Sequence, residues 1–280
     1  MSKYIEKVER MTVPVIVLRG IVAFPSIPLS FELTDDASAA VCEAAKANNS
    51  YLLFLTQRDP SQEKPQVSDL FSVGTIAKIT QLLKLTEGNT RIVIDSACRA
   101  VTEEIWEDGS GSFLAHVMCK TLTLADENSV RVEALLLEVN TLLDDFVKYL
   151  PKVSVEMMLT LKAIKSPGLL ADFIACNILI KLADKQKILE EFDPIKRLER
   201  LAVILQRELE ILQTEQEIQK KVRAQIDENQ REYYLRQQMR VIQGELGGDP
   251  DGDGEIDEYM EKIGKACLPK EVEDKLVKEV

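Results

Sequence analysis

The chain has 280 residues, of which 45% are hydrophobic and only 5% aromatic, and its formal net charge is −12. No apolar run reaches the roughly 18 residues of a membrane span, and the N-terminus MSKYIEKVER has no apolar signal-peptide region. The acidic balance argues against nucleic acid as the main partner, because phosphate neutralisation needs clustered lysines and arginines. We therefore expect a cytoplasmic protein with no membrane partner.

The cysteines and the single histidine give little support to metal or disulfide chemistry. His116 is the only histidine, so a zinc site is not expected. The five cysteines form an odd, scattered set without a C-x-x-C pair, which is typical of thiols in a reducing compartment. They are Cys42, Cys98, Cys119, Cys176 and Cys267.

Residues 1–124 carry mainly strand signals. Short apolar runs are separated by prolines and by the turn Glu87-Gly88-Asn89, and an alanine-rich stretch at residues 36 to about 48 predicts one helix among them. This pattern predicts a mostly antiparallel β domain, either a curled sheet or a pseudo-barrel, within an α+β chain. The runs YLLFL (residues 51–55) and QLLKL (residues 81–85) are more apolar than one sheet face needs. They are interpreted as core, with a contact surface as the alternative.

Residues 125–193 read as a helical bundle, including a long amphipathic stretch before Pro151 and a helix opened by Ser166-Pro167. Residues 194–247 then read as one helix, on the order of 75 to 80 Å long. Asp193 is a good N-cap and Pro194 suits the first helical position. A helix of this length cannot be buried within one small domain, so we expect it to project toward other molecules.

The apolar positions of this helix change character along its length. A short seam with spacings of 4, 3, 4 and 3 predicts packing on the helix's own domain, and it consists of Leu198, Ala202, Leu205, Leu209 and Leu212. Farther on, Ile218, Val222 and Ile226 follow a looser period. There we expect packing against other subunits rather than a permanent two-stranded zipper.

Residues 245–280 hold twelve acidic and five basic side chains, so this segment alone carries −7 of the net charge. Asp249, Asp251, Asp253 and Gly254 match positions of a calcium-binding EF-hand loop, but position twelve, which needs a bidentate Glu, is Met260. We therefore favour an acidic linker at residues 248–256 over a calcium site. Calcium binding by residues 249–261 stays open at this stage.

No catalytic apparatus is visible. The chain has no G-x-x-x-x-G-K-[ST] phosphate loop, no G-x-G-x-x-G and no G-x-S-x-G. Strict alternation in the strand FLAHVMCK places His116 and Lys120 opposite Phe113 and Cys119, which favours a half-exposed strand residue over a general base. We predict no catalytic, cofactor-binding or metal-binding residue, so the chain itself is not expected to be an enzyme.

Four segments carry a family resemblance. They are VPVIVLRGIVAFPSIPLSFEL (residues 13–33), DLFSVGTIAKITQLLKLTEGNTRIVI (69–94), PGLLADFIACNILIKLADKQKILEEFD (167–193) and DENQREYYLRQQMRVIQGELG (227–247). In this order they resemble the N-terminal region of Lon, the ATP-dependent serine protease of the AAA+ family. The last segment, with its YYLR motif, is the most specific of the four.

The resemblance also implies what lies beyond this sequence. Lon proteins continue into an AAA+ ATPase module and a protease domain with a Ser-Lys dyad, whereas this chain stops at KLVKEV. Residues 257–280 resemble the start of the helical lead-in to the ATPase, so we expect a fragment or an early-ending product. ATP and Mg²⁺ are implied only for the missing domains, and no cofactor is expected in this chain.

For function, the resemblance implies a substrate-recognition and assembly region that captures misfolded or tagged proteins, with other copies of itself as partners in a hexamer. Tyr233, Tyr234, Leu235 and Met239 are the candidate contact residues, because aromatic rings and a flexible thioether suit varied unfolded segments. The alternative for these residues is packing against a neighbouring long helix. For the whole chain, the alternatives are a stand-alone regulatory or scaffold protein and, less favoured by the charge, an RNA-binding role.

Overall fold

The computed structural model describes residues 4–33, 35–62, 65–85, 89–109, 112–124, 129–149, 154–179, 181–245 and 253–266. By its internal contacts the chain divides into two units, residues 1–212 and residues 213–280. The strands are β1 (Tyr4–Leu18), β2 (Leu29–Leu33), β3 (Leu52–Thr56), β4 (Val73–Lys84), β5 (Thr90–Glu107) and β6 (Phe113–Leu124). The helices are α1 (Asp36–Ala47), the short 3-10 helix η1 (Val67–Asp69), α2 (Val130–Val147), α3 (Val155–Ala163), α4 (Pro167–Asn177), α5 (Leu182–Glu190), α6 (Pro194–Glu245) and α7 (Asp253–Lys265).

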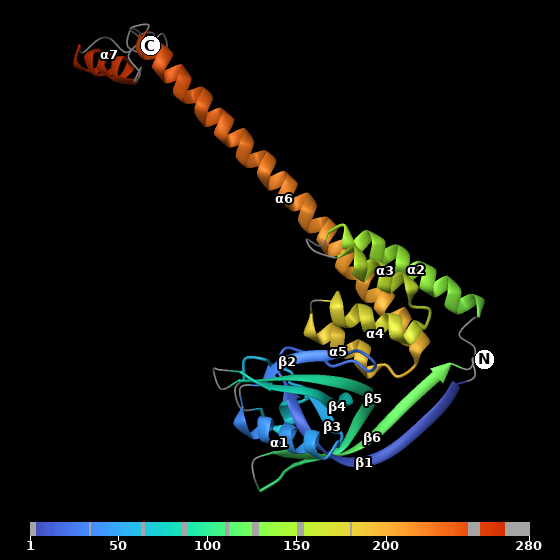
Figure 1. The fold of residues 1–280 in the computed structure, drawn as a ribbon. Coiled ribbons are helices and arrows are strands. Elements are labelled where there is room, and N and C mark those ends of the chain that lie inside the picture. The colour runs from blue at the N-terminus through green and yellow to red at the C-terminus, as the bar shows by residue number, and fades with distance from the viewer. Residues whose placement is uncertain are drawn as a thin grey trace. The chain divides into compact units, whose positions relative to one another are not determined.

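The six strands form one sheet in the order β2-β5-β4-β3-β1-β6, and an additional pairing of β5 with β6 closes it into a barrel-like ring (Figure 1). The closure is possible because β5 is long enough to serve two neighbours. Residues 90–94 pair with β2 and residues 100–107 pair with β6. Only β1 and β3 run parallel, and the other pairs are antiparallel. The predicted mostly antiparallel pseudo-barrel is confirmed.

Strand β1 begins earlier than the sequence signals, which start at Val13. It runs from Tyr4 and pairs with β6 from Tyr4↔Leu124 to Val15↔Phe113. The segment before Met11 is rich in charge, and Ile5 and Val8 are both exposed, so hydrophobic alternation does not reveal the strand. The pairing with β6 decides its conformation instead.

Strand β3 is the centre of the sheet domain, since every one of its residues is buried. Leu52 and Phe54 belong to one core, which also contains buried residues of α1, while Leu53 and Leu55 belong to a second core on the other face. A strand covered on both faces reads as a continuous apolar run, which explains YLLFL. Gly74 on β4 lies so close to β3 that an added Cβ would be 2.3 Å from the carbonyl oxygen of Phe54.

The helices α2 to α5 pack with the first part of α6 around a core that also includes Val22, Phe24, Ile27 and Val73 of the sheet domain. The expected start of α6 is confirmed, because the Asp193 carboxylate accepts hydrogen bonds from the N–H groups of Ile195 (2.9 Å) and Lys196 (3.3 Å). The seam from Leu198 to Leu209 is buried in this core, and Leu212 packs at its edge. The proximal part of α6 is therefore an integral member of the bundle.

A buried ionic cluster joins the sheet to the helices within residues 1–212. Asp172 of α4 accepts hydrogen bonds from Arg99 of β5 and, at 3.1 Å, from Arg197 of α6. Arg99 also donates to the carbonyl oxygen of Leu189 at 2.9 Å, which brings the end of α5 to the same place. One carboxylate thus holds together strands and helices that are far apart in sequence.

We predict that Asp172→Asn lowers the free energy of unfolding by about 3–5 kcal/mol, because the substitution keeps the side-chain volume but leaves two buried guanidinium groups without a counter-charge. Urea denaturation at neutral pH measures this. The matched control is Asp144→Asn, which breaks the exposed ion pair with Lys162 and should cost at most about 1 kcal/mol. Equal losses in the two variants would show that the buried cluster contributes no more than a surface pair.

Candidate functional site

The residues selected from the sequence as contact candidates lie on α6, which is helical without interruption from Pro194 to Glu245. Between Pro194 and Gly244 this segment contains neither proline nor glycine, and it is rich in Gln, Glu, Arg and Leu, which favour helix. Nothing in the segment therefore terminates the helix where the bundle ends.

One line of isoleucines shows how α6 passes from core to solvent. Ile204, Ile211 and Ile218 follow each other at seven-residue intervals, and their exposed fractions are 5%, 39% and 55%. After Leu212 every side chain from Gln213 to Ile242 is exposed. We define the distal stripe as Ile211, Ile218, Val222 and Ile226, four exposed apolar residues spaced at seven, four and four along the helix. Such spacing places them on one face.

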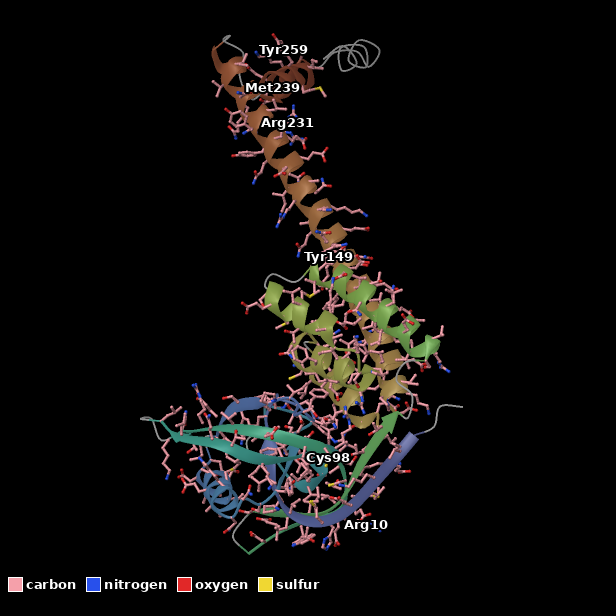
Figure 2. The ribbon with its side chains drawn as sticks, turned by 45° about the vertical axis from the view of Figure 1, so that its right-hand side comes forward. Arg10, Cys98, Tyr149, Arg231, Met239 and Tyr259 are labelled. Carbon is pink, nitrogen blue, oxygen red and sulfur yellow. The ribbon has the colours of Figure 1, made fainter. Side chains whose placement is uncertain are left out.

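The tip cluster consists of Tyr233, Tyr234, Leu235 and Met239, whose exposed fractions are 67%, 64%, 51% and 60%. Figure 2 shows the side chains along this part of α6, with Arg231 and Met239 labelled. Two local contacts order the segment without covering it. Gln237 donates a hydrogen bond to the Tyr233 hydroxyl at 3.3 Å, and Arg236 pairs with Glu232 at 2.7 Å one turn apart. The rings and the thioether stay available.

Sequence reasoning missed two members of this surface. Val241 and Ile242 are 61% and 54% exposed and follow Met239 within one helical turn. An adjacent pair of aliphatic residues in a segment otherwise rich in Arg and Gln was the signal that could have found them. They enlarge the exposed apolar area beyond the two tyrosines.

The second candidate contact surface consists of two apolar runs of the sheet domain, YLLFL and QLLKL, which differ in burial. In YLLFL, Leu52 to Leu55 are buried core as interpreted, whereas Tyr51 is 40% exposed. In QLLKL the outcome is mixed, because Leu83 is 54% exposed whereas Leu82 packs against the core that contains α1. The difference arises because adjacent residues of a strand point to opposite faces of the sheet, so Leu82 faces the core and Leu83 faces away from it.

His116 lies on the exposed face of β6, while Ala115, Val117 and Cys119 are buried, as the alternation predicts. Its Nδ1 is 2.8 Å from the Thr12 hydroxyl, and its ring centroid is 4.6 Å from that of Trp106. Glu104 is its register partner on β5. These cross-strand contacts account for the ring on a sheet surface and support the interpretation of His116 as a strand residue.

The segment that resembles a calcium-binding EF-hand loop lies partly outside the described residues, since Asp249 and Asp251 fall between α6 and α7. Helix α7 begins at Asp253, inside the range predicted as an acidic linker, and it places Gly254 in a helix where an EF-hand loop needs a sharp turn. Within the described residues no group of three or more His, Cys, Asp or Glu side chains is arranged to hold a metal ion. Those residues also include no helix long and apolar enough to cross a membrane.

Two of the thiols share a cavity of about 230 Å³ on the sheet domain. Cys98 of β5 and Cys119 of β6 line it together with Lys7 and Glu9 (Cys98 is labelled in Figure 2). A hydrogen bond from Cys119 lowers the pKa of Cys98, while the same contact and burial raise the pKa of Cys119. Burial raises the pKa of Cys42 to about 12.

Comparison with known proteins identifies the family. Residues 12–207 match the model of the ATP-dependent protease La (LON) substrate-binding domain, and the chain belongs to this family. The resemblance read from the motifs is thereby confirmed. The matched model describes the substrate-binding domain of that protease.

The relatives are longer than this chain. The Lon protease of Heliobacterium modesticaldum is 38% identical over 267 residues, which are 95% of this chain and 32% of that protein. The Lon protease of Escherichia coli K12 is 34% identical over 270 residues, 96% of this chain and 34% of that protein. The chain thus spans about a third of the length of these relatives.

Solved structures agree on the fold. The N-terminal domain of Mycobacterium avium complex Lon protease superposes with a TM-score of 0.56 at 23% identity, covering 70% of this chain and 98% of that one. The Lon N-terminal domain protein from Xanthomonas campestris gives a TM-score of 0.51 at 14% identity, covering 69% and 98%. At these identities the likeness concerns architecture alone.

We predict that Cys98 reacts first with iodoacetamide among the four described cysteines, because its lowered pKa increases the thiolate fraction and its side chain is half-exposed. Limited alkylation of the folded chain at pH 8, followed by peptide mass spectrometry, measures the order. Cys42 serves as the internal control and should stay unmodified until the protein is denatured. Faster labelling of Cys42 than of Cys98 would contradict the prediction.

Proposed function

We propose that this chain captures misfolded or tagged proteins and supports assembly for a Lon-type ATP-dependent protease, in which an AAA+ motor and a Ser-Lys protease domain carry out unfolding and cleavage. The chain's own role is recognition, and none of its residues performs chemistry. ATP and Mg²⁺ act in the other domains of the family and need no site here. We place this activity in the cytoplasm, in line with the free thiols of the described cysteines.

The exposure of the tip cluster carries this proposal. Four large apolar side chains are more than half exposed on a helix whose proximal end is fixed in the bundle core. Exposed apolar surface of this kind marks interaction sites in soluble proteins. Tyrosine offers a large amphipathic ring, and methionine adapts its shape to irregular partners. Unfolded polypeptide, which exposes varied apolar segments, is the partner that fits this chemistry.

Assembly is assigned to the distal stripe. Its residues share one face of α6, and neighbouring basic side chains such as Lys220 and Arg223 are exposed as well. A row of aliphatic residues flanked by charge suits packing against another helix. Other copies of this chain are the proposed partners, in a hexamer for the full-length family. Several weak tip contacts would then act together, so that substrates are held by avidity and still released.

We predict that replacing the tip cluster by Tyr233→Ser, Tyr234→Ser, Leu235→Gln and Met239→Gln weakens binding of denatured casein by about tenfold or more, since the loss of a single contact worth about 1.4 kcal/mol already produces tenfold. Fluorescence anisotropy with labelled casein measures binding, and gel analysis should show no cleavage, with or without ATP. Circular dichroism checks that the helix persists. Unchanged casein affinity in the quadruple variant would refute the capture role of the tip.

The matched variant on the same helix is Ile218→Gln, Val222→Gln and Ile226→Gln. We predict that it shifts sedimentation toward smaller species while each copy retains its affinity for casein, because it changes the distal stripe and spares the tip. The quadruple tip variant should show the opposite pattern. If the tip variant alone dissociates the assembly and leaves casein binding intact, the tip cluster is a contact between copies.

A further inference from the structure

A second cavity of about 230 Å³ lies at the junction of the sheet domain with the helices, within residues 1–212. Its wall is formed by β5, β6, the first turn of α4 and the beginning of α6. The buried cluster of Arg99, Asp172 and Arg197 is part of this wall. The cavity is separate from the exposed surface of α6 and has no role in the function proposed above.

The charges that line this cavity do not balance. Among the described lining residues the cations are Arg99, Arg197 and Lys120, and the sole carboxylate is that of Asp172. Lys120 has an exposed partner in Glu6, at 2.7 Å, whereas the two arginines share Asp172. Burial and the neighbouring Arg99 lower the pKa of Arg197 to about 10. The residues that line the cavity therefore carry more positive than negative charge, and the carboxylates of Glu191 and Asp193 act on Arg197 from outside the lining.

Hydrogen-bond donors are also in excess there. A guanidinium has five N–H donors. Arg197 uses its donors on the carbonyl oxygens of Glu191, Gly168 and Phe192 and on Asp172. Arg99 donates from Nε to Leu189 and from one terminal nitrogen to Asp172, which leaves further N–H groups at a residue that lines the cavity.

The first turn of α4 adds backbone donors to the same wall. At the start of this helix the Leu170 N–H donates to the Ser166 carbonyl oxygen at 2.9 Å, so the N–H groups of Gly168 and Leu169 precede the first intrahelical bond. Gly168 also lets the neighbouring chain come close, because an added Cβ would be 3.1 Å from both Arg197 and Pro194. Two buried guanidinium groups and a helix N-terminus thus converge on one cavity, and this combination is selective for anions.

We propose that this cavity binds a small oxyanion of the phosphate or carboxylate type, held by Arg99 and Arg197 and by the first-turn amides of α4. The anion neutralises the surplus charge and ties β5 to α4 and α6. Planar guanidinium groups match the oxygen spacing of both classes of anion, and Leu122, Leu169 and Phe192 provide apolar wall for the remainder of a larger ligand. Occupancy stabilises the junction between the sheet and the bundle.

Thermal unfolding of the full chain tests this site with inorganic phosphate in one arm and acetate in the other, each at constant ionic strength against chloride. Because the anion binds the folded state, Tm should rise with anion concentration in a saturable way, and titration calorimetry should give one site per chain. A response to phosphate alone assigns a phosphate-type ligand, and a response to acetate assigns a carboxylate. No stabilisation by either anion beyond chloride would overturn the proposal.

Substitutions of residues inside and outside the cavity test whether the anion binds there. Lys120→Gln at the rim should weaken anion binding about threefold, as expected for a partly screened charge. Lys162→Gln, which also breaks an exposed ion pair but lies outside the cavity, should leave binding unchanged. Arg99→Lys keeps the charge but loses the fork geometry and should weaken binding by about tenfold.

Ser166→Asp provides a test that does not depend on weakening the fold. It places a carboxylate at the start of α4, beside the proposed anion position, and should raise Tm in chloride while abolishing the added effect of phosphate or acetate. If Ser166→Asp and Lys120→Gln both retain the full wild-type response, the anion binds elsewhere and the assignment to this cavity is wrong.

Discussion

Asp172 is the residue on which the arrangement of residues 1–212 depends most. Its carboxylate is buried and receives hydrogen bonds from Arg99 on the sheet and Arg197 at the start of α6. Arg197 in turn holds the carbonyl oxygens of Glu191 and Phe192, which fixes the chain just before α6 begins. The same ions that attach the sheet domain therefore also fix the first turn of α6 within residues 1–212.

The sheet domain reaches stability by covering one strand completely. Strand β3 lies between two cores and pairs with β1 and β4 on either side, and the long β5 closes the ring by pairing with both β4 and β6. Closure leaves fewer open strand edges, and open edges are where a sheet can pair with other chains.

Helix α6 is long enough to be a core helix of the bundle at one end and an exposed surface at the other. Its proximal residues, such as Leu198 and Leu205, are fully buried in the bundle, whereas its distal residues present the stripe and the tip cluster to solvent. The same heptad line, from Ile204 to Ile218, serves first as core and then as exposed surface. The role of Tyr233 and its neighbours stays a prediction, because exposure indicates availability and not the identity of the partner.

The sequence by itself determined the family, the strand-rich first region and the start of α6, because Asp193, Pro194 and the heptad seam are local signals that act within a few residues. Only the tertiary structure decided that β1 starts at Tyr4, that Leu52 to Leu55 are buried on both faces of the sheet, and that Arg99 meets Asp172 across 73 positions. Those outcomes depend on pairing, burial and charge neutralisation between residues distant in the chain. Composition and periodicity describe neighbouring residues in the sequence, so contacts between distant residues are seen only in the folded structure.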